Sequence, residues 1–248
     1  MIESKSLLAK LLAEENIVVE FKKTTTASAN LKDRILILPE LKEGISNVIT
    51  TLFIGHEVGH FLFTDFDEWN IARKEVSKDL LNICEDVRIE KKIQQNYPGL
   101  KTDFIKGYKE LNSERDFFNI KGKDLNNFEF IDRLNLRTKL GAGLMIKFSD
   151  KELEFVERAE TITTFEEVVS LSKEIEEFIK KQEQKKEKEQ ESSDENSEEP
   201  EEPSNSCCSS GVPEESDDGE EYFDSNNSEQ GFDYNESVGK CLNWVVNH

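Results

Sequence analysis

The sequence predicts an α+β domain with a few short strands, mostly helices, and an acidic tail. Two segments near the N-terminus are rich in β-branched residues, which is typical of strands. Several later segments repeat apolar residues at helical spacing. A long stretch near the C-terminus lacks basic residues altogether. The 248-residue length therefore suits one medium-sized domain with an extension.

The predicted strands lie close to the N-terminus. Leucines at helical spacing first predict a short helix over about Lys5–Glu15. The segment IVVEFKK, Ile17–Lys23, is expected to be a strand, and TTTASAN after it a polar connection. RILILPEL, Arg34–Leu41, is expected to be a second strand closed by Pro39.

The rest of the domain is expected to be helical. Asn47–Thr64 is apolar nearly all round, which predicts a buried central helix. Ser77–Gln95 has a wide apolar face and ends before the stop signal Tyr97-Pro98-Gly99. Further helices are expected at about Thr102–Leu111 and Phe128–Leu140, and after the capping boxes Ser149-x-x-Glu152 and Thr164-x-x-Glu167, the last one continuing into KKQEQKKEKEQE.

The charge of the chain is unevenly distributed. Residues 191–239 hold 17 acidic and no basic residues, which leaves −4 of the total formal charge of −21 for the rest of the chain. We therefore expect a folded domain over 1–180, a charged, mostly acidic disordered linker over 181–235, and a short apolar segment over 236–248. Because acidity of this kind repels phosphates, no binding to nucleic acid is expected.

The composition also indicates the cellular compartment of the protein. The four cysteines show no disulfide framework, and Cys84 is expected in the core, which fits a reducing compartment. Charges interrupt the apolar residues of MIESKSLLAKLLAEEN, so the N-terminus is interpreted as an amphipathic helix and not as a signal peptide. No run approaches the roughly 18 apolar residues of a membrane span. We expect a cytoplasmic protein without a membrane partner.

The stretch FIGHEVGHFL holds two of the three histidines of the chain. His56 and His60 are four residues apart, so on a helix both imidazoles lie on one face and can bind one ion. Glu57 is placed to take a proton from a water on that ion, which is the chemistry behind the HExxH pattern. Zinc is the usual metal for imidazole and carboxylate ligands with one open position, and one Zn²⁺ per chain is expected.

The alternative interpretation is a core helix whose histidines bond to backbone or carboxylate groups. Two histidines and a glutamate on an otherwise apolar helix are costly to bury without partners, which favours the metal site. Gly59, between the histidines, would let another segment of the chain approach the metal closely.

A catalytic zinc commonly has three protein ligands. His248, the remaining histidine, follows the acidic stretch, which leaves a carboxylate for the third position. Glu85 lies inside the apolar run LLNICEDVRIE and is the preferred candidate, with Asp86 as the alternative. Asp86 and Glu90 share a helix face, and one of them could accept a hydrogen bond from the other nitrogen of a histidine. A solvated face with local ion pairs that include Arg88 explains the same residues equally well.

Five blocks of the sequence together resemble a known family. They are TASANLKDRILILPEL, GHEVGHFLFT, LLNICEDVRIEKKIQQNYPGL, GYKELN and IDRLNLRTKLG. Their order resembles the gluzincin-like metallopeptidases predicted in large tailed bacteriophages, whose longer members carry a von Willebrand factor A-like region after an acidic linker. The resemblance covers roughly residues 26–179. It implies a zincin-like core, in which a small twisted sheet packs on the HExxH helix and a second helix brings Glu85. RILILPEL would border the substrate cleft, where an extended substrate could add to it by β-pairing.

These observations predict a zinc-dependent metallopeptidase that acts on protein or peptide substrates, in the host cytoplasm if the chain is phage-encoded. Glu57 is the expected general base, and it would later pass its proton to the leaving amine. Tyr97, Tyr108 and Arg88 are candidates to stabilise the oxyanion. Simple packing at helix ends is the competing interpretation for both tyrosines.

The sequence is also compatible with a different class of function. The chain could be a non-catalytic metal-binding assembly or interaction protein that binds a protein partner through its acidic tail. The tail could equally be a solubilising linker, or a segment that holds a protease inactive.

Overall fold

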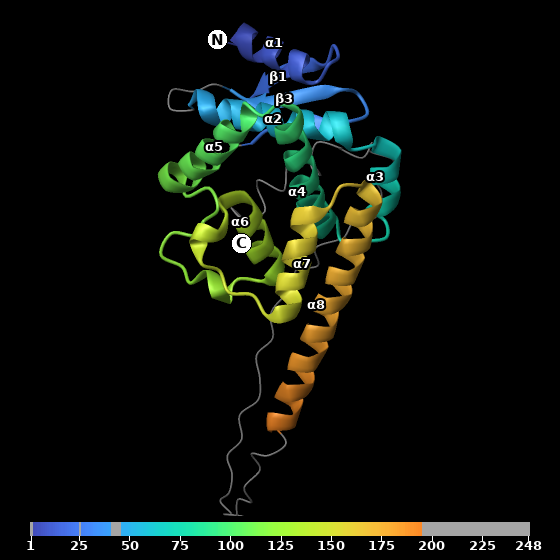
Figure 1. The fold of residues 1–248 in the computed structure, drawn as a ribbon. Helices are drawn as coiled ribbons and strands as arrows, with labels where there is room; N and C mark the ends of the chain where they lie inside the picture. The colour runs from blue at the N-terminus through green and yellow to red at the C-terminus, as the bar shows by residue number, and fades with distance from the viewer. Residues whose placement is uncertain (1, 25, 41–45, 195–248) are drawn as a thin grey trace, which may run out of the picture. The chain divides into compact units, whose positions relative to one another are not determined.

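The fold was analysed in a computed structural model that describes residues 2–24, 26–40 and 46–194 (Figure 1). The described elements are α1 (Ile2–Leu12), β1 (Val18–Lys22), β2 (Ser28–Asn30), β3 (Ile35–Pro39), α2 (Asn47–Phe63), α3 (Phe66–Ala72), α4 (Lys78–Asn96), α5 (Leu100–Arg115), the 3-10 turn η1 (Leu125–Asn127), α6 (Phe130–Leu140), the 3-10 turn η2 (Ala142–Leu144), α7 (Asp150–Thr161) and α8 (Phe165–Asp194). The mixed α+β class is confirmed, with a small sheet and mostly helices.

Two elements differ from the sequence-based prediction. The predicted polar connection TTTASAN contains β2, whose three residues are all buried. The structure also has a short helix, α3, that was not predicted. Asp65 begins it, because its side chain accepts hydrogen bonds from the backbone N–H groups of Asp67 and Glu68.

The sheet has three strands in the order β1-β3-β2. β1 pairs with β3 in parallel, with Val18 opposite Ile35, and β2 pairs with β3 antiparallel, with Ala29 opposite Leu36. The segment RILILPEL therefore forms the central strand. The expected pairing of an extended substrate with this segment is wrong, because both edges of the strand already have strand partners. β2 is the edge strand that contacts α2.

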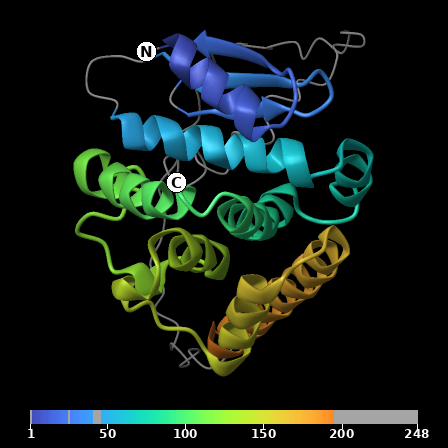
Figure 2. The ribbon, with the colours of Figure 1, turned by 45° about the horizontal axis from the view of Figure 1, so that its top comes forward.

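One hydrophobic core lies between the sheet and the first helices. α1 and the sheet cover one side of α2, and α5 packs on the other side, as Figure 2 shows. The apolar residues of α2 that enter this core include Leu52, Ile54 and Val58. Because α2 is covered on both sides, its sequence is apolar nearly all round, as predicted.

A second core lies among the later helices. It joins the beginning of α4 to α3, α6, α7 and the first turns of α8 through Trp69, Leu80, Phe155 and Leu171, among others. α4 thus contributes to both cores, since Ile93 near its end packs into the first one. This double packing fixes α4 against α2, and the candidate site lies between these two helices.

A glycine allows the close approach of α2 and α4. A Cβ atom at Gly59 would lie 2.9 Å from Cδ1 of Ile89, closer than real Cβ contacts come. The close approach expected at Gly59 is therefore made by α4.

Both predicted capping boxes are present. Ser149 and Glu152 bond reciprocally at the start of α7. At the start of α8, Glu167 accepts from the backbone of Thr164 and donates its own N–H to the Thr164 hydroxyl. α8 continues into the charged run as predicted. Residues 195–248, which include most of the predicted acidic linker and the whole C-terminal segment, lie outside the described residues. Among the described helices, none has the length and apolarity that crossing a membrane requires.

Candidate metal centre

Three buried side chains on two helices converge at one point. His56 and His60 lie one turn apart on α2, and Asp86 lies on the facing side of α4. Oδ1 of Asp86 lies 3.2 Å from Nε2 of His60 and 3.6 Å from Nε2 of His56. Their ligand atoms all lie within 4.8 Å of one another, and each residue is at most 1% exposed. This group could hold a metal ion.

The atoms that face this point have no hydrogen-bond partner. Twelve buried side-chain atoms lack a partner in the described part of the chain; three of them belong to this group and two more to the neighbouring Glu57. They are Nε2 of His56, Nε2 of His60, Oδ1 of Asp86 and both carboxylate oxygens of Glu57. Because buried polar atoms are normally satisfied, such a concentration of unpaired ligand atoms fits a cation site.

The ring of His56 is oriented by Glu90. Nδ1 of His56 lies 2.8 Å from Oε1 of Glu90, one turn beyond Asp86 on α4. A carboxylate only accepts hydrogen bonds, so Nδ1 carries a proton, and Nε2 is the nitrogen left to bind a cation. The sequence analysis predicted that Asp86 or Glu90 would bond the second nitrogen of a histidine, and in the structure Glu90 does so.

The ring of His60 is oriented through a hydroxyl group. Nδ1 of His60 lies 3.2 Å from Oγ1 of Thr64, and that hydroxyl donates its only proton to Oε1 of Glu85 at 2.5 Å. Thr64 can therefore only accept from His60, and Nδ1 is again the protonated nitrogen. Both histidines thus turn Nε2 toward Asp86 while a partner engages Nδ1, the arrangement that metal-binding histidines need.

Glu85, the preferred third ligand of the sequence analysis, does not join the group. Its carboxylate forms a two-point ion pair with Arg88, with Nε donating to Oε2 at 2.7 Å and Nη2 to Oε1 at 2.6 Å. Arg88 also donates to the backbone carbonyl of Phe63 at the end of α2. The position expected for Glu85 is occupied by Asp86, the alternative candidate, because consecutive helical residues point about 100° apart.

Lys139 of α6 was missed by the sequence analysis. Its side chain is 2% exposed, and Nζ lies 3.0 Å from Oδ2 of Asp86 and also contacts Oε1 of Glu90. Burial alone would raise the pKa of both carboxyl groups, but the Lys139 ammonium and the neighbouring imidazoles outweigh it. The pKa of Asp86 is therefore held well below its usual range, and that of Glu90 is also lowered.

Glu57 is fully buried beside the two histidines. Its carboxylate oxygens have no hydrogen-bond partner of ordinary geometry, although the backbone of Ala29 in β2 lies near enough to lower its pKa slightly. Desolvation dominates and raises the pKa of Glu57 to about 8, against a smaller lowering effect of His60. An unpaired acid with a raised pKa is typical of a functional group and costly for one that only packs.

The three residues considered as oxyanion donors are engaged elsewhere. The Tyr97 hydroxyl shares its one proton between the Leu12 carbonyl at 3.1 Å and the Glu14 carboxylate at 2.7 Å, at the side of α1. The Tyr108 hydroxyl donates to Oε1 of Glu90 at 2.5 Å, and burial followed by this carboxylate raises its pKa well above 10. Arg88 holds Glu85, as described. All three therefore support other groups in this conformation.

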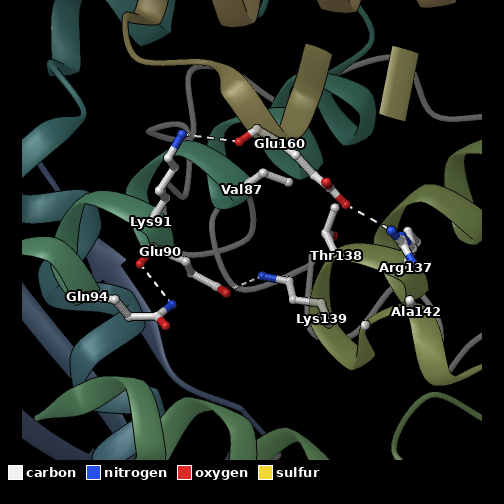
Figure 3. Close-up of a pocket in the computed structure, with 10 residues that line it drawn as sticks. Val87, Glu90, Lys91, Gln94, Arg137, Thr138, Lys139, Ala142 and Glu160 are labelled. Carbon is white, nitrogen blue, oxygen red and sulfur yellow. Dashed lines mark hydrogen bonds and ion pairs between the residues drawn. The ribbon is translucent and has the colours of Figure 1, made fainter. Parts of the chain in front are cut away.

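Two cavities border the residues that orient the ligands. One, of about 340 Å³, lies between α4 and α6, and Figure 3 shows the contact between Glu90 and Lys139 in its lining. The other, also of about 340 Å³, lies at the end of α2 and includes Arg34 and Thr64 among its lining residues. Neither of these two cavities is lined by His56 or His60. The candidate ligands are thus closed off from both.

Two buried asparagines add polar atoms to the same helix faces. Asn82 precedes Asp86 by one turn of α4, and Asn135 precedes Lys139 by one turn of α6. The Asn82 side-chain oxygen and both polar atoms of the Asn135 amide lack partners. The sequence analysis did not consider either residue, although their i, i+4 spacing from the acid and the lysine was visible.

No protein-family model, curated protein or solved structure matches this chain. The resemblance to phage metallopeptidases therefore stays a prediction.

Proposed function

We propose that this protein is a zinc-dependent metallopeptidase with a zincin-like core. The observation that carries the proposal is the convergence of three unpaired ligand atoms, from His56, His60 and Asp86, beside the unpaired carboxylate of Glu57. Two imidazoles, one carboxylate and an open position form the donor set that catalytic zinc sites use. A zinc ion held there would lower the pKa of its water to about 7 and polarise the carbonyl of a peptide bond.

The residues of the chain have distinct roles in this proposal. Glu57 accepts a proton from the attacking water and delivers it to the leaving amine. Its carboxylate form is favoured when positive charge lies next to it, since opposite charges lower the pKa of a carboxyl group. Glu90 and Thr64 keep the protons of His56 and His60 on Nδ1, so that both Nε2 lone pairs stay available.

The test is proteolysis by the zinc-loaded full chain, measured with a labelled unfolded protein substrate. We expect Glu57→Gln to lower the rate by about 10²–10⁴-fold, because general base catalysis contributes that much. Zinc content should stay unchanged, since Glu57 is not one of the ligands. Glu114→Gln, an exposed glutamate on α5, is the matched control and should be fully active. Equal activity of Glu57→Gln and wild type would contradict the proposal.

One observation favours a second candidate function, a purely structural metal site. His56, His60 and Asp86 are all at most 1% exposed, so a peptide reaches none of them in this conformation. A structural site, however, leaves the cost of burying Glu57 unexplained. Zinc loading distinguishes the catalytic site from the structural site. A structural site predicts that zinc raises the thermal stability of both wild type and Glu57→Gln, and that neither protein shows proteolysis.

A further inference from the structure

We propose that Lys139 is a positioning residue of the metal centre, which holds Oδ2 of Asp86 so that only Oδ1 is left to coordinate a cation, and which fixes Glu90 behind His56. The inference rests on the proposed metal centre. It concerns a residue on a third helix, α6, 53 positions along the chain from Asp86.

The first argument concerns the two oxygens of Asp86. Oδ1 faces the two Nε2 atoms and has no hydrogen-bond partner, whereas Oδ2 accepts from Nζ of Lys139 at 3.0 Å. The two oxygens of one carboxylate therefore have different tasks. While Oδ2 is bound to the ammonium group, the carboxylate supplies one oxygen, and the donor set remains two nitrogens and one oxygen. Such a set suits zinc, whereas additional oxygens suit harder cations.

The second argument concerns Glu90. Its Oε1 atom accepts from three donors: Nδ1 of His56, the hydroxyl of Tyr108 and Nζ of Lys139. Without the ammonium group, two buried carboxylates would lie one turn apart on the same face of α4 with no ammonium between them. Repulsion would then displace Glu90, and with it the group that orients His56. Lys139 thus acts on two ligands at once, one directly and one through Glu90.

A positioning role and a purely electrostatic role predict opposite results. A positive charge beside a cation site repels the cation, so its removal by Lys139→Met should strengthen metal binding if charge alone matters. If Lys139 positions the ligands, the same substitution should weaken Zn²⁺ binding by about 10–100-fold, as losses of groups behind metal ligands do. Competition with a chelating dye measures this difference directly.

Co²⁺ absorption gives the second readout, because it reports the coordination number of the bound ion. If Lys139 had only a structural role, its replacement would not change this absorption. Wild type should show the intense visible bands of a four-coordinate site. Lys139→Met should show a several-fold loss of intensity, as the freed Oδ2 joins the coordination shell. Lys139→Arg keeps a buried donor and should restore much of the wild-type spectrum. The matched control is Lys91→Met, on the rim of the same cavity, where Nζ donates to the Glu160 carbonyl (Figure 3).

A variant without Lys139 could fail to fold, so the pair Glu90→Gln/Lys139→Met is also required. It removes one charge of each sign, and the proposal still predicts the loss of Co²⁺ intensity because Asp86 is released. A wild-type spectrum in this pair, or unchanged or tighter Zn²⁺ binding in Lys139→Met, would overturn the role of Lys139 alone. Absence of Zn²⁺ and Co²⁺ binding in wild type would overturn the metal centre and this inference together.

Discussion

Oδ1 of Asp86 lies 3.2 Å from Nε2 of His60, while Glu85, one residue earlier on α4, turns its carboxylate to Arg88. The two acids have opposite relations to the same pair of helices. Asp86 faces α2 and offers an unpaired oxygen, whereas Glu85 is satisfied by Arg88 and by the hydroxyl of Thr64. Replacement of Asp86 and replacement of Glu85 should therefore have different effects on the protein.

Removal of Glu85 should affect stability more than metal binding. Glu85→Ala leaves the Arg88 guanidinium, which is 2% exposed, without its carboxylate partner. Breaking a buried pair in this way costs about 3–5 kcal/mol, so the free energy of unfolding should fall by that order. Urea unfolding measures it. The double variant Glu85→Gln/Arg88→Met should recover part of the loss. Equal losses of stability in Glu85→Ala and in the double variant would contradict the ion pair as the cause.

The approach of α5 to α2 predicts a steric effect at Gly107. A Cβ atom there would lie 2.8 Å from Cδ2 and 2.9 Å from Cβ of Leu52, and the latter atom cannot move without the backbone of α2. Gly107→Ala should therefore destabilise the protein by about 1–3 kcal/mol, as overpacking does. Gly99→Ala at the start of the same helix has open space around its Cβ and should change stability by less than about 1 kcal/mol. Thermal unfolding of both variants distinguishes a steric cause from a loss of helix flexibility.

Replacement of Tyr108 should cost more stability than replacement of Tyr97. Tyr108→Phe removes a buried donor to the Glu90 carboxylate and should cost about 1.5–3 kcal/mol of stability, the value of a hydrogen bond to a charged group. Tyr97→Phe removes a proton that is shared between an exposed contact with Glu14 and a partly buried one with the Leu12 carbonyl, and a cost of about 1 kcal/mol is expected. Chemical denaturation gives both values. A larger loss for Tyr97→Phe would contradict the assignment of Tyr108 to the support of Glu90.

Asp132 on α6 predicts a pH-dependent difference in stability. Desolvation, followed by the nearby Glu129, raises the pKa of Asp132 to about 7 from 3.8. The native state therefore holds this proton up to a higher pH than the unfolded chain does, and the stability that Asp132 contributes is lost as the pH rises from 4 to 7. Asp132→Asn has no such proton, so its stability relative to wild type should increase across this window. We expect about 1 kcal/mol at most, because solvent screens this half-buried group.

Unfolding midpoints of wild type and Asp132→Asn at pH 4.5 and pH 8 test this expectation. Glu129→Gln serves as the companion variant, since loss of the second cause should lower the pKa of Asp132 and shift the window to lower pH. A constant difference between wild type and Asp132→Asn at both pH values would contradict the shift.

Local patterns predicted the parts of the fold that depend on local chemistry. The apolar run of α2 and the reciprocal caps at Ser149 and Thr164 follow from neighbours in sequence, and all were found as expected. β2 was missed because its residues, Ser28–Asn30, are small or polar and become a strand only by pairing with β3. Strand formation there depends on a partner that the local pattern does not contain.

The candidate site was predictable from the sequence except for the choice between two adjacent acids, Glu85 and Asp86. The spacing of His56 and His60 places two imidazoles on one face, but the apolar run around Glu85 does not tell which acid faces α2. Two signals favoured Asp86: Arg88 follows Glu85 at i+3, where it forms a local ion pair, and Glu90 follows Asp86 at i+4, on the same face. No local sequence pattern indicated the role of Lys139, since its contacts with α4 depend on how α6 packs.

The measurement that tests the central claim most directly is the zinc content of the purified full chain and of single-site variants. Wild type, His56→Ala, Asp86→Ala and the exposed-site control Glu114→Gln are each dialysed against Zn²⁺, and the bound metal is then counted. The account predicts about one zinc per chain in wild type and in the control, as expected for a three-ligand site, and loss of zinc in His56→Ala and Asp86→Ala. A wild type without zinc, or an Asp86→Ala variant that keeps it, would contradict the account.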